Sequence, residues 1–274
     1  MIIKTLLENE ALSDEFLTEH GLSLYIETKE RKIVFDTGAT NKFIMNAKTL
    51  DVNLRLADMA ILSHGHYDHG GGLLDFLDMN KDAYVYVQKG AFKGHGSLEE
   101  NEEITDAGLD IEIKENERVK IVEEDIFFDD DLILFSHIKG KELVPRGNDT
   151  LLMKTEDKWE KDDFEHEQNL IIREGRNRVL IVGCSHKGIV NILNAAQEIS
   201  DLPITHVLGG FHLYDLDLNS IEDMEFLKDV ADRLLESNAI FYTGHCTGRD
   251  QYYKLKEFMG DKINELSTGI SINI

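Results

Sequence analysis

Four potential metal ligands fall within six consecutive positions of this chain, and this cluster constrains its fold and function more than any other feature. The four residues are His64, His66, Asp68 and His69. They directly follow the apolar run 59–62, which predicts a buried strand, and loops at strand ends commonly carry functional sites. Imidazole and carboxylate groups are suitable ligands for zinc, iron or manganese. The cluster therefore predicts a metal site at the end of a strand.

The spacing within the cluster suggests how its members divide between ions. Alternate residues of an extended segment project to the same side, so His64, His66 and Asp68 converge if the loop stays extended. A turn after Asp68 would direct His69 toward a second ion. The glycine run 70–72 permits the tight backbone that this arrangement needs.

The charge balance argues against some partners. The 274 residues include 53 Asp and Glu against 29 Lys and Arg, which gives a formal net charge of -24. A field of this sign repels phosphodiester backbones, so we expect a small-molecule substrate and no nucleic-acid partner. The sequence leaves open whether the chain forms a homo-oligomer.

Cysteine usage and hydropathy indicate the cellular compartment of the chain. Its two cysteines, Cys184 and Cys246, are too few for a disulfide framework and fit a reduced compartment. The N-terminus does not have the pattern of a signal peptide. No apolar stretch approaches the ~20 residues that a membrane helix needs. We therefore expect a cytoplasmic protein with no membrane partner.

The chain is predicted to form one continuous domain, residues 1–274, because it has only two prolines and no Pro/Gly/Ser-rich linker. Apolar patterning predicts strands that alternate with helices. The predicted strands cover 22–28, 32–35, 58–63, 83–88, 169–173, 178–183, 204–208 and 239–243, and the predicted helices cover 41–47, 73–79, 188–199, 221–236 and 251–259. Both halves pass from a hairpin through a helix and a strand to a second helix. This order suggests two mixed sheets packed face to face, with helices outside and a weak internal repeat.

These motifs resemble those of a known family. The sequence His64-x-His66-x-Asp68-His69 resembles the signature of the metallo-β-lactamase superfamily, and Phe35-Asp36-Thr37-Gly38 resembles its first motif. The resemblance covers essentially the whole chain, and it implies an α/β (α+β) fold arranged as a four-layer αββα sandwich. Further segments resemble a branch that includes archaeal 7,8-dihydropterin-6-methyl-4-(β-D-ribofuranosyl)aminobenzene 5'-phosphate synthases, enzymes of methanopterin biosynthesis. These segments are Glu19-His20-Gly21-Leu22-Ser23, Gly183-Cys184-Ser185-His186, Gly209-Gly210-Phe211-His212-Leu213 and Gly244-His245-Cys246-Thr247-Gly248.

The resemblance implies ligands for two metal ions. In the superfamily one ion commonly binds two histidines of the first loop and a later histidine, and the other binds the Asp-His pair and a last histidine. Here His64 and His66 match the first set, and Asp68 and His69 match the second. His245 matches the last histidine. Asp68 is also assigned a catalytic role.

The bridging position is where this sequence departs from the superfamily. An aspartate is expected after the strand 178–183, but Cys184 stands there, and we predict His186 as the ligand. Since thiolate binds zinc well, a metal-bound Cys184, a buried inert thiol and a redox-labile pair with Cys246 all stay open. His166 stands roughly where a ligand histidine sometimes lies, but its charged neighbours favour a surface residue.

Several polar residues receive other expectations. Asp36 is predicted to orient a ligand histidine through a hydrogen bond. His212 and His20 are predicted to bind substrate, with a core histidine as the alternative. His95 is expected in a solvent-exposed loop, and Asn148 belongs to an ordinary turn signal.

Three functions are compatible with these residues. No P-loop, Rossmann fingerprint or Gly-x-Ser-x-Gly motif offers a competing site. The first hypothesis is therefore a hydrolase that uses a dinuclear site, with zinc or else manganese or iron, to activate water against a small phosphorylated or ester substrate. The second is a transferase that joins a dihydropterin-methyl diphosphate to an arylamine, as the branch implies. The third is a metal-bearing redox or binding protein.

Overall fold

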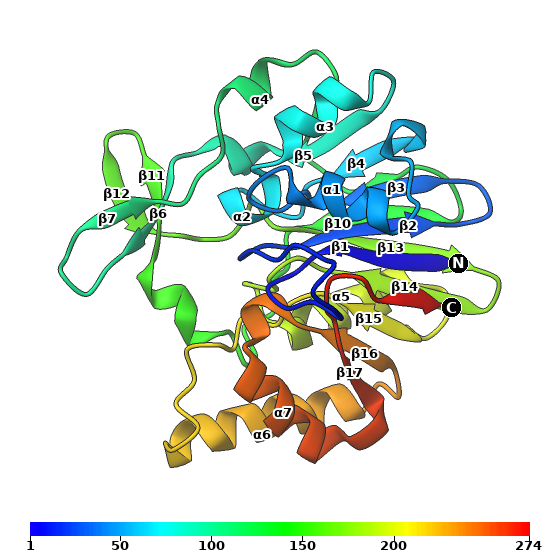
Figure 1. Cartoon of the computed structure of the whole chain (residues 1–274). Coiled ribbons are helices and arrows are strands. Elements are labelled where there is room, and N and C mark those ends of the chain that lie inside the picture. Colours follow the sequence, from blue (N-terminus) through cyan, green and yellow to red (C-terminus); the bar gives the residue numbers. More distant parts are fainter. The chain divides into compact units, whose positions relative to one another are not determined.

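The computed structural model describes residues 1–274, and the chain divides into two compact units. Unit 1 comprises Met1–Glu123, Thr150–His166 and Ser267–Ile274. Unit 2 comprises Glu124–Asp149 and Glu167–Leu266. Each unit contains one seven-stranded mixed sheet and its own hydrophobic core (Figure 1).

The large sheet of unit 1 changes from antiparallel to parallel pairing along its width. Its strands lie in the order β18 (Ser271–Asn273), β1 (Ile2–Leu7), β2 (Ser23–Glu27), β3 (Lys32–Phe35), β4 (Met59–Ile61), β5 (Tyr84–Gln88) and β8 (Val119–Val122). Neighbours pair antiparallel from β18 to β3 and parallel from β3 to β8. The helices of this unit are α1 (Lys42–Thr49), η1 (Leu54–Leu56), α2 (Tyr67–Gly70), α3 (Leu73–Met79), η2 (Lys89–Phe92) and α4 (Glu112–Glu115).

Helices α1 and α3 pack on one face of this sheet. Phe43 and Ala47 are four residues apart on α1, and both belong to the buried cluster that also contains Phe76 of α3. The same cluster contains Val34 of β3 and Val85 of β5. Residues four apart lie on one side of a helix, so this spacing gives α1 the apolar face that it buries.

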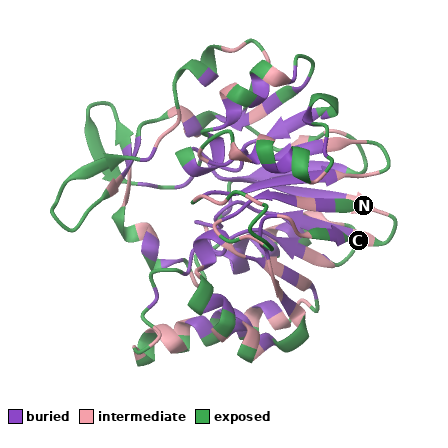
Figure 2. Ribbon diagram, in the orientation of Figure 1, coloured by how far each residue is buried: buried purple, intermediate pink, exposed green.

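Unit 1 also contains a smaller antiparallel sheet that is largely exposed (Figure 2). Its strands lie in the order β12 (Lys158–Lys161), β11 (Leu151–Thr155), β6 (His95–Leu98) and β7 (Ile104–Asp106). Every residue of β7 and β12 is exposed. Two residues at this sheet are buried and matter for the site. They are His95, the first residue of β6, and Asp162, which directly follows β12.

The sheet of unit 2 has the same change of pairing. Its strands lie in the order β17 (Ile263–Glu265), β16 (Ile240–Thr243), β15 (His206–Leu208), β14 (Asn177–Ile181), β13 (Gln168–Glu174), β10 (Leu132–Ser136) and β9 (Ile126–Phe127). Pairing is antiparallel from β9 to β14 and parallel from β14 to β17. The helices are η3 (Arg146–Thr150), α5 (Ile189–Ile199), α6 (Ile221–Leu235), η4 (His245–Thr247), α7 (Arg249–Met259) and η5 (Gly260–Lys262).

Helix α6 illustrates why these segments form helices. The Ser220 hydroxyl accepts a hydrogen bond from the peptide N–H of Asp223 and so caps the first turn. Leu227, Ala231 and Leu234, which are four and three residues apart, lie on the buried side of the helix. They belong to a core cluster with residues of α5, α7 and the sheet.

All eight predicted strands and all five predicted helices correspond to elements of the structure, with ends that differ by a few residues. The predicted order of hairpin, helix, strand and helix is also confirmed in both halves. The hairpin β2–β3 is followed by α1, β4 and α3, and the hairpin β13–β14 is followed by α5, β15 and α6. Strands β1, β6 to β12, β17 and β18 had no predicted range. No helix is long and apolar enough to cross a membrane.

Candidate metal centre

The loop after β4 carries the predicted ligands of unit 1, and all four are buried. The condition of an extended loop is not met from Tyr67 onward, because helix α2 begins there and the peptide N–H of Gly70 donates to the carbonyl of His66. The glycine run allows this turn to pack tightly. A Cβ atom on Gly71 would lie 2.2 Å from the carbonyl oxygen of Ala39.

The turn brings the ligand side chains of this loop together. The ring centroid of His64 lies 4.6 Å from that of His66 and 4.2 Å from that of His69. The Oδ2 atom of Asp68 lies 3.6 Å from the Nε2 atom of His69. The donors therefore converge although the backbone is not extended.

Asp36 and Ser63 fix the protonation of two of these rings. Asp36 Oδ2 lies 2.6 Å from His69 Nδ1, and because a carboxylate only accepts, the neutral His69 ring carries its proton on Nδ1. The Ser63 hydroxyl donates to Asp36 Oδ2 at 2.7 Å and therefore accepts from His64 Nδ1 at 2.8 Å. In both rings the lone pair is then on Nε2, which is the form that a metal ligand needs.

Burial determines the protonation state of the third histidine. It lowers the pKa of His66 well below the ordinary value of 6.5, and the nearby His166 lowers it further. The ring is therefore neutral at neutral pH, as metal ligation requires.

The segment that contains His20 supports the aspartate of the loop. His20 Nδ1 faces the side-chain amide of Asn9 at 3.3 Å, and the Asn9 carbonyl oxygen accepts from the peptide N–H of Gly21. This orientation makes His20 Nδ1 an acceptor and places the ring proton on Nε2, which lies 3.3 Å from Asp68 Oδ2. The His20 side chain is 55% exposed, so it holds a predicted ligand and is open to solvent.

The donors of unit 2 follow the parallel strands β14, β15 and β16, and all of them are buried. Cys184 stands at the centre of this group. Its Sγ lies within 4.8 Å of a ring nitrogen of each of His186, His212 and His245, and of the Sγ of Cys246. The carboxyl ends of parallel strands meet at one edge of a sheet, which explains why residues as far apart in sequence as Cys184 and Cys246, 62 positions, gather here.

His186 is held by two residues that the sequence did not mark as site residues. The Asn148 amide donates to the His186 carbonyl at 2.7 Å, so its oxygen is the atom that accepts from His186 Nδ1 at 2.8 Å. This leaves the lone pair of the neutral ring on Nε2. The buried Glu167 carboxylate accepts from the peptide N–H groups of His186 and Lys187 at 2.6 Å and 3.0 Å. A turn signal alone could not indicate the contact that Asn148 makes.

His212 and the two cysteines form a second group of contacts in unit 2. The peptide N–H of His212 donates to Cys246 Sγ at 3.3 Å, and the Cys246 thiol contacts the Cys184 carbonyl at 3.6 Å. The His212 ring centroid lies 4.2 Å from that of His186. Both cysteines are buried, and no disulfide joins them.

Backbone strain gathers at these strand ends. Asp36, Ser185, His212 and His245 have φ values of 59°, 61°, 51° and 51°, in the left-handed region that residues other than glycine rarely adopt. Such conformations persist where the surrounding contacts enforce them, and they concentrate at functional sites.

Two histidines that were expected at the surface are buried, which corrects the prediction. His95 is 0% exposed and His166 is 2% exposed. Asp162 lies between them, with its Oδ2 atom 2.8 Å from His95 Nδ1 and 3.2 Å from His166 Nε2. The charged neighbours of His166 are misleading, since Asp163 and Glu165 point outward on alternate positions. That alternation is the sequence signal from which the burial could have been predicted.

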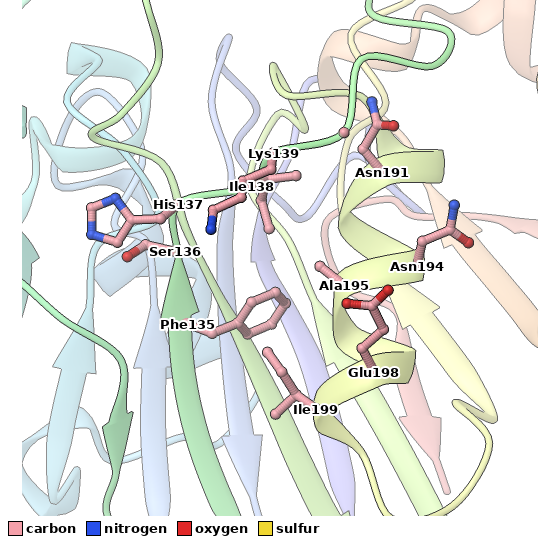
Figure 3. A pocket seen from close by; sticks show the side chains of 11 residues that line it. Phe135, Ser136, His137, Ile138, Lys139, Asn191, Asn194, Ala195, Glu198 and Ile199 are labelled. Atoms are coloured by element: carbon pink, nitrogen blue, oxygen red, sulfur yellow. The ribbon is translucent and has the colours of Figure 1, made fainter.

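A cavity of about 350 Å³ in unit 2 lies apart from the predicted site residues (Figure 3). Asn191, Asn194 and Glu198 of α5 line one side, and the segment 135–140 lines the other. The Asn191 amide has a structural role, because its oxygen accepts from the peptide N–H of Glu142 and its nitrogen donates to the Glu142 carbonyl. None of the predicted site residues lines this cavity.

Comparison with known proteins agrees with this arrangement. The family model described as the metallo-beta-lactamase superfamily matches residues 18–229. An uncharacterized protein of Methanocaldococcus jannaschii is 32% identical over 267 residues, which cover 93% of this chain and 94% of that protein. The 7,8-dihydropterin-6-methyl-4-(beta-D-ribofuranosyl)-aminobenzene-5'-phosphate synthase of the same organism is 31% identical over 278 residues, with 94% and 92% covered. The predicted resemblance to that branch is confirmed.

Solved structures show the same family. Tm1679, described as a metal-dependent hydrolase of the beta-lactamase superfamily, is 30% identical with a TM-score of 0.83 and covers 100% of this chain and 99% of its own. Zn²⁺-bound PqqB from Methylobacterium extorquens has a TM-score of 0.60 at 13% identity, with 100% of both chains covered, and shows the fold alone. The predicted fold class is confirmed, and the chain belongs to the metallo-β-lactamase superfamily.

Proposed function

We propose that this chain is a metal-dependent hydrolase that acts on a small phosphorylated or ester substrate. One observation carries the proposal. His64, His69 and His186 each direct Nδ1 at a fixed acceptor, so each neutral ring presents the lone pair of Nε2. Metal-ligating histidines are commonly held in this way, because the partner fixes both the tautomer and the ring orientation.

The donor set suits two divalent ions, for which zinc is our first assignment. We assign the ligands that the superfamily pattern implies, namely His64, His66, Asp68, His69, His186 and His245. Nitrogen and oxygen donors suit zinc, with manganese or iron as alternatives. When bound, such ions supply Lewis-acid polarisation of the substrate and a water of lowered pKa.

The remaining residues hold and orient these ligands. We assign Asp68 a catalytic role besides ligation, with its carboxylate kept in place by His20 Nε2 at 3.3 Å. His20 is open to solvent and His212 lies against the His186 ring, so both are assigned to substrate binding. Asp36 and Asn148 act as orienting residues.

Metal analysis combined with a substrate panel tests the proposal. After reconstitution with zinc, manganese or iron, we expect about two ions per chain and hydrolysis within a panel of phosphodiesters, phosphomonoesters, lactones and thioesters. His66→Ala should abolish turnover and lower the metal content. His137→Ala, a change at an exposed histidine outside the ligand set, should do neither. Less than one ion per reconstituted chain, with an unchanged His66→Ala variant, would contradict the proposal.

A transferase is the second candidate, and the similarity to the M. jannaschii synthase over 94% of this chain favours it. In that reaction the arylamine nitrogen forms a bond to the methyl carbon of a dihydropterin-methyl diphosphate, and diphosphate leaves. Incubation with both substrates and mass analysis of the product tests this. A new carbon–nitrogen bond supports the transferase, whereas hydrolysis alone or no turnover contradicts it.

A further inference from the structure

Four buried residues of unit 1 form a polar cluster that the ligand assignment uses only in part. They are His66, His95, Asp162 and His166, and their donor atoms all lie within 4.8 Å of one another. Such a set is either a cation site or a hydrogen-bond network. The position of each proton distinguishes the two.

The contact between Gly65 and His166 determines that position. The peptide N–H of Gly65 donates to His166 Nδ1 at 2.8 Å, so Nδ1 is an acceptor. A neutral imidazole then carries its proton on Nε2, which lies 3.2 Å from Asp162 Oδ2. A protonated Nε2 has no lone pair for a metal. His166 is therefore a donor to Asp162 and not a metal ligand.

Both carboxylate oxygens of Asp162 are used as acceptors. Its Oδ2 atom faces His95 Nδ1 at 2.8 Å in addition to His166 Nε2, and its Oδ1 atom accepts from the peptide N–H of Phe164 at 2.8 Å. Burial raises the pKa of the carboxyl, but hydrogen bonds from His166 and His95 outweigh this and hold the pKa well below its ordinary value. The buried carboxylate accepts from His166 Nε2 and from the Phe164 peptide N–H, and it accepts from His95 Nδ1 when the His95 proton is on that nitrogen rather than on Nε2, which lies 3.3 Å from the Gly90 carbonyl oxygen.

The network ends at the one residue that separates two predicted ligands. Gly65 stands between His64 and His66, and its peptide N–H is held by His166. Its other side has no space, since a Cβ atom there would lie 2.5 Å from the carbonyl oxygen of Ala91 and 2.9 Å from His95 Nε2. The backbone between the two predicted ligands is thus hydrogen-bonded to His166 and closely approached by His95, the two histidines next to Asp162.

We propose that Asp162 is a positioning residue of the metal loop, which acts through His166 to hold the Gly65 peptide and so the spacing of His64 and His66. His95 begins strand β6 of the smaller sheet and Asp162 directly follows its strand β12, so this role also gives that sheet a function. The inference rests on the proposed function, because it assumes that His64 and His66 bind metal.

Asp162→Asn tests the network at its centre. The carboxamide replaces one acceptor by a donor, which pushes the His166 proton onto Nδ1, where it opposes the Gly65 N–H. We expect zinc affinity, measured by competition with a chromophoric chelator, to fall about 10- to 100-fold. Asp163→Asn, a change of the exposed neighbouring carboxylate, should leave the affinity unchanged. Thermal unfolding of the metal-free variants shows whether each one is folded.

Two substitutions of His166 separate an acceptor from a ligand. In His166→Asn, the amide oxygen occupies the position of Nδ1 and can still accept from Gly65, whereas His166→Leu has no acceptor. We expect His166→Asn to bind zinc nearly as tightly as the wild type and His166→Leu to resemble Asp162→Asn. Equal loss in both variants, with less metal per chain, would identify His166 as a ligand and overturn the proposal.

A measurement without metal separates this inference from the proposed function. Long-range ¹⁵N correlation spectra of the metal-free protein report the tautomer of His166, and we expect the proton on Nε2 in the wild type and on Nδ1 in Asp162→Asn. If the wild type binds no zinc, the proposed function and the positioning role both fail, whatever the tautomer. If the wild type and Asp162→Asn bind zinc equally, only the positioning role fails. An additional ion that is lost in Asp162→Asn would show a cation site and overturn the network.

Discussion

The Oδ2 atom of Asp36 lies 2.6 Å from the Nδ1 atom of His69, and neither side chain is exposed to solvent. The two residues are 33 positions apart in the sequence. They meet because β3 and β4 pair in parallel with Phe35 opposite Ile61, which places the ends of both strands at one edge of the sheet. The contact therefore depends on strand register as much as on either motif.

Asp36→Asn should weaken metal binding about 10- to 100-fold, because the amide removes the charged acceptor that fixes the His69 tautomer. Asparagine tolerates the φ of 59° at this position, so the backbone is not a confounding factor. The metal-free protein should also lose about 1–3 kcal/mol in free energy of unfolding, as measured in urea. Asp82→Asn, at an exposed site, is the control. Unchanged zinc affinity in Asp36→Asn would show that Asp36 does not orient a ligand.

Asn148→Ala should lower zinc affinity through His186 alone. The substitution removes the acceptor for His186 Nδ1 and the donor to the His186 carbonyl. A double-mutant cycle checks the route, since Asn148→Ala should cost little further affinity in a His186→Ala background. Additive losses of affinity would mean that Asn148 acts elsewhere. Asn101→Ala, at an exposed position, is the matched control.

Gly65→Ala should destabilise the metal-free protein by about 1–3 kcal/mol, because the new Cβ atom would meet the backbone of Ala91 at 2.5 Å and 2.7 Å. Backbone atoms cannot move aside as the end of a side chain can. At Gly108 the nearest atoms to a Cβ would be a carboxylate oxygen of Asp106 and the backbone nitrogen of His95, both at 3.3 Å, so the contacts are much longer and Gly108→Ala should change stability much less. Urea denaturation of both variants measures the difference, and equal effects would contradict the tight packing at Gly65.

Acid stability should depend in part on Asp201. A hydrogen bond from Arg178 lowers the pKa of this carboxyl from 3.8 to about 2. The lowered value means that the interaction stabilises the folded state above pH 3.8 and that this contribution is lost as the pH falls through about 2. Wild type and Asp201→Asn should therefore differ in urea midpoint at pH 6 and converge between pH 4 and pH 2. Asp229→Asn should not show this convergence, and parallel curves for Asp201→Asn would contradict the assignment.

Much of the fold could be predicted from sequence because its signals are local. The period of apolar residues in 221–236 and the polar turn between 169–173 and 178–183 are properties of short segments, and both elements form as predicted. The loop of candidate ligands could be found for the same reason, since four potential donor residues lie within six positions.

What could not be predicted depends on contacts between distant segments. The charged neighbours of His166 gave a surface prediction, yet Asp162 and Gly65 bind both of its ring nitrogens in the interior of unit 1. The sequence around Asn148 is typical of a turn, and only the tertiary structure brings its side chain to the His186 ring, which it can orient.

The sequence by itself determined the superfamily motifs, the alternation of strands and helices, and the residue types that can bind metal. The tertiary structure decided which nitrogen of each histidine is available. In a neutral imidazole one nitrogen carries the proton and donates a hydrogen bond, and the other keeps its lone pair. For His64 the acceptor is the Ser63 hydroxyl. That hydroxyl can accept because its own proton is donated to Asp36, which follows another strand. The sequence determines which residue types could bind a metal, whereas packing determines the direction of each hydrogen bond.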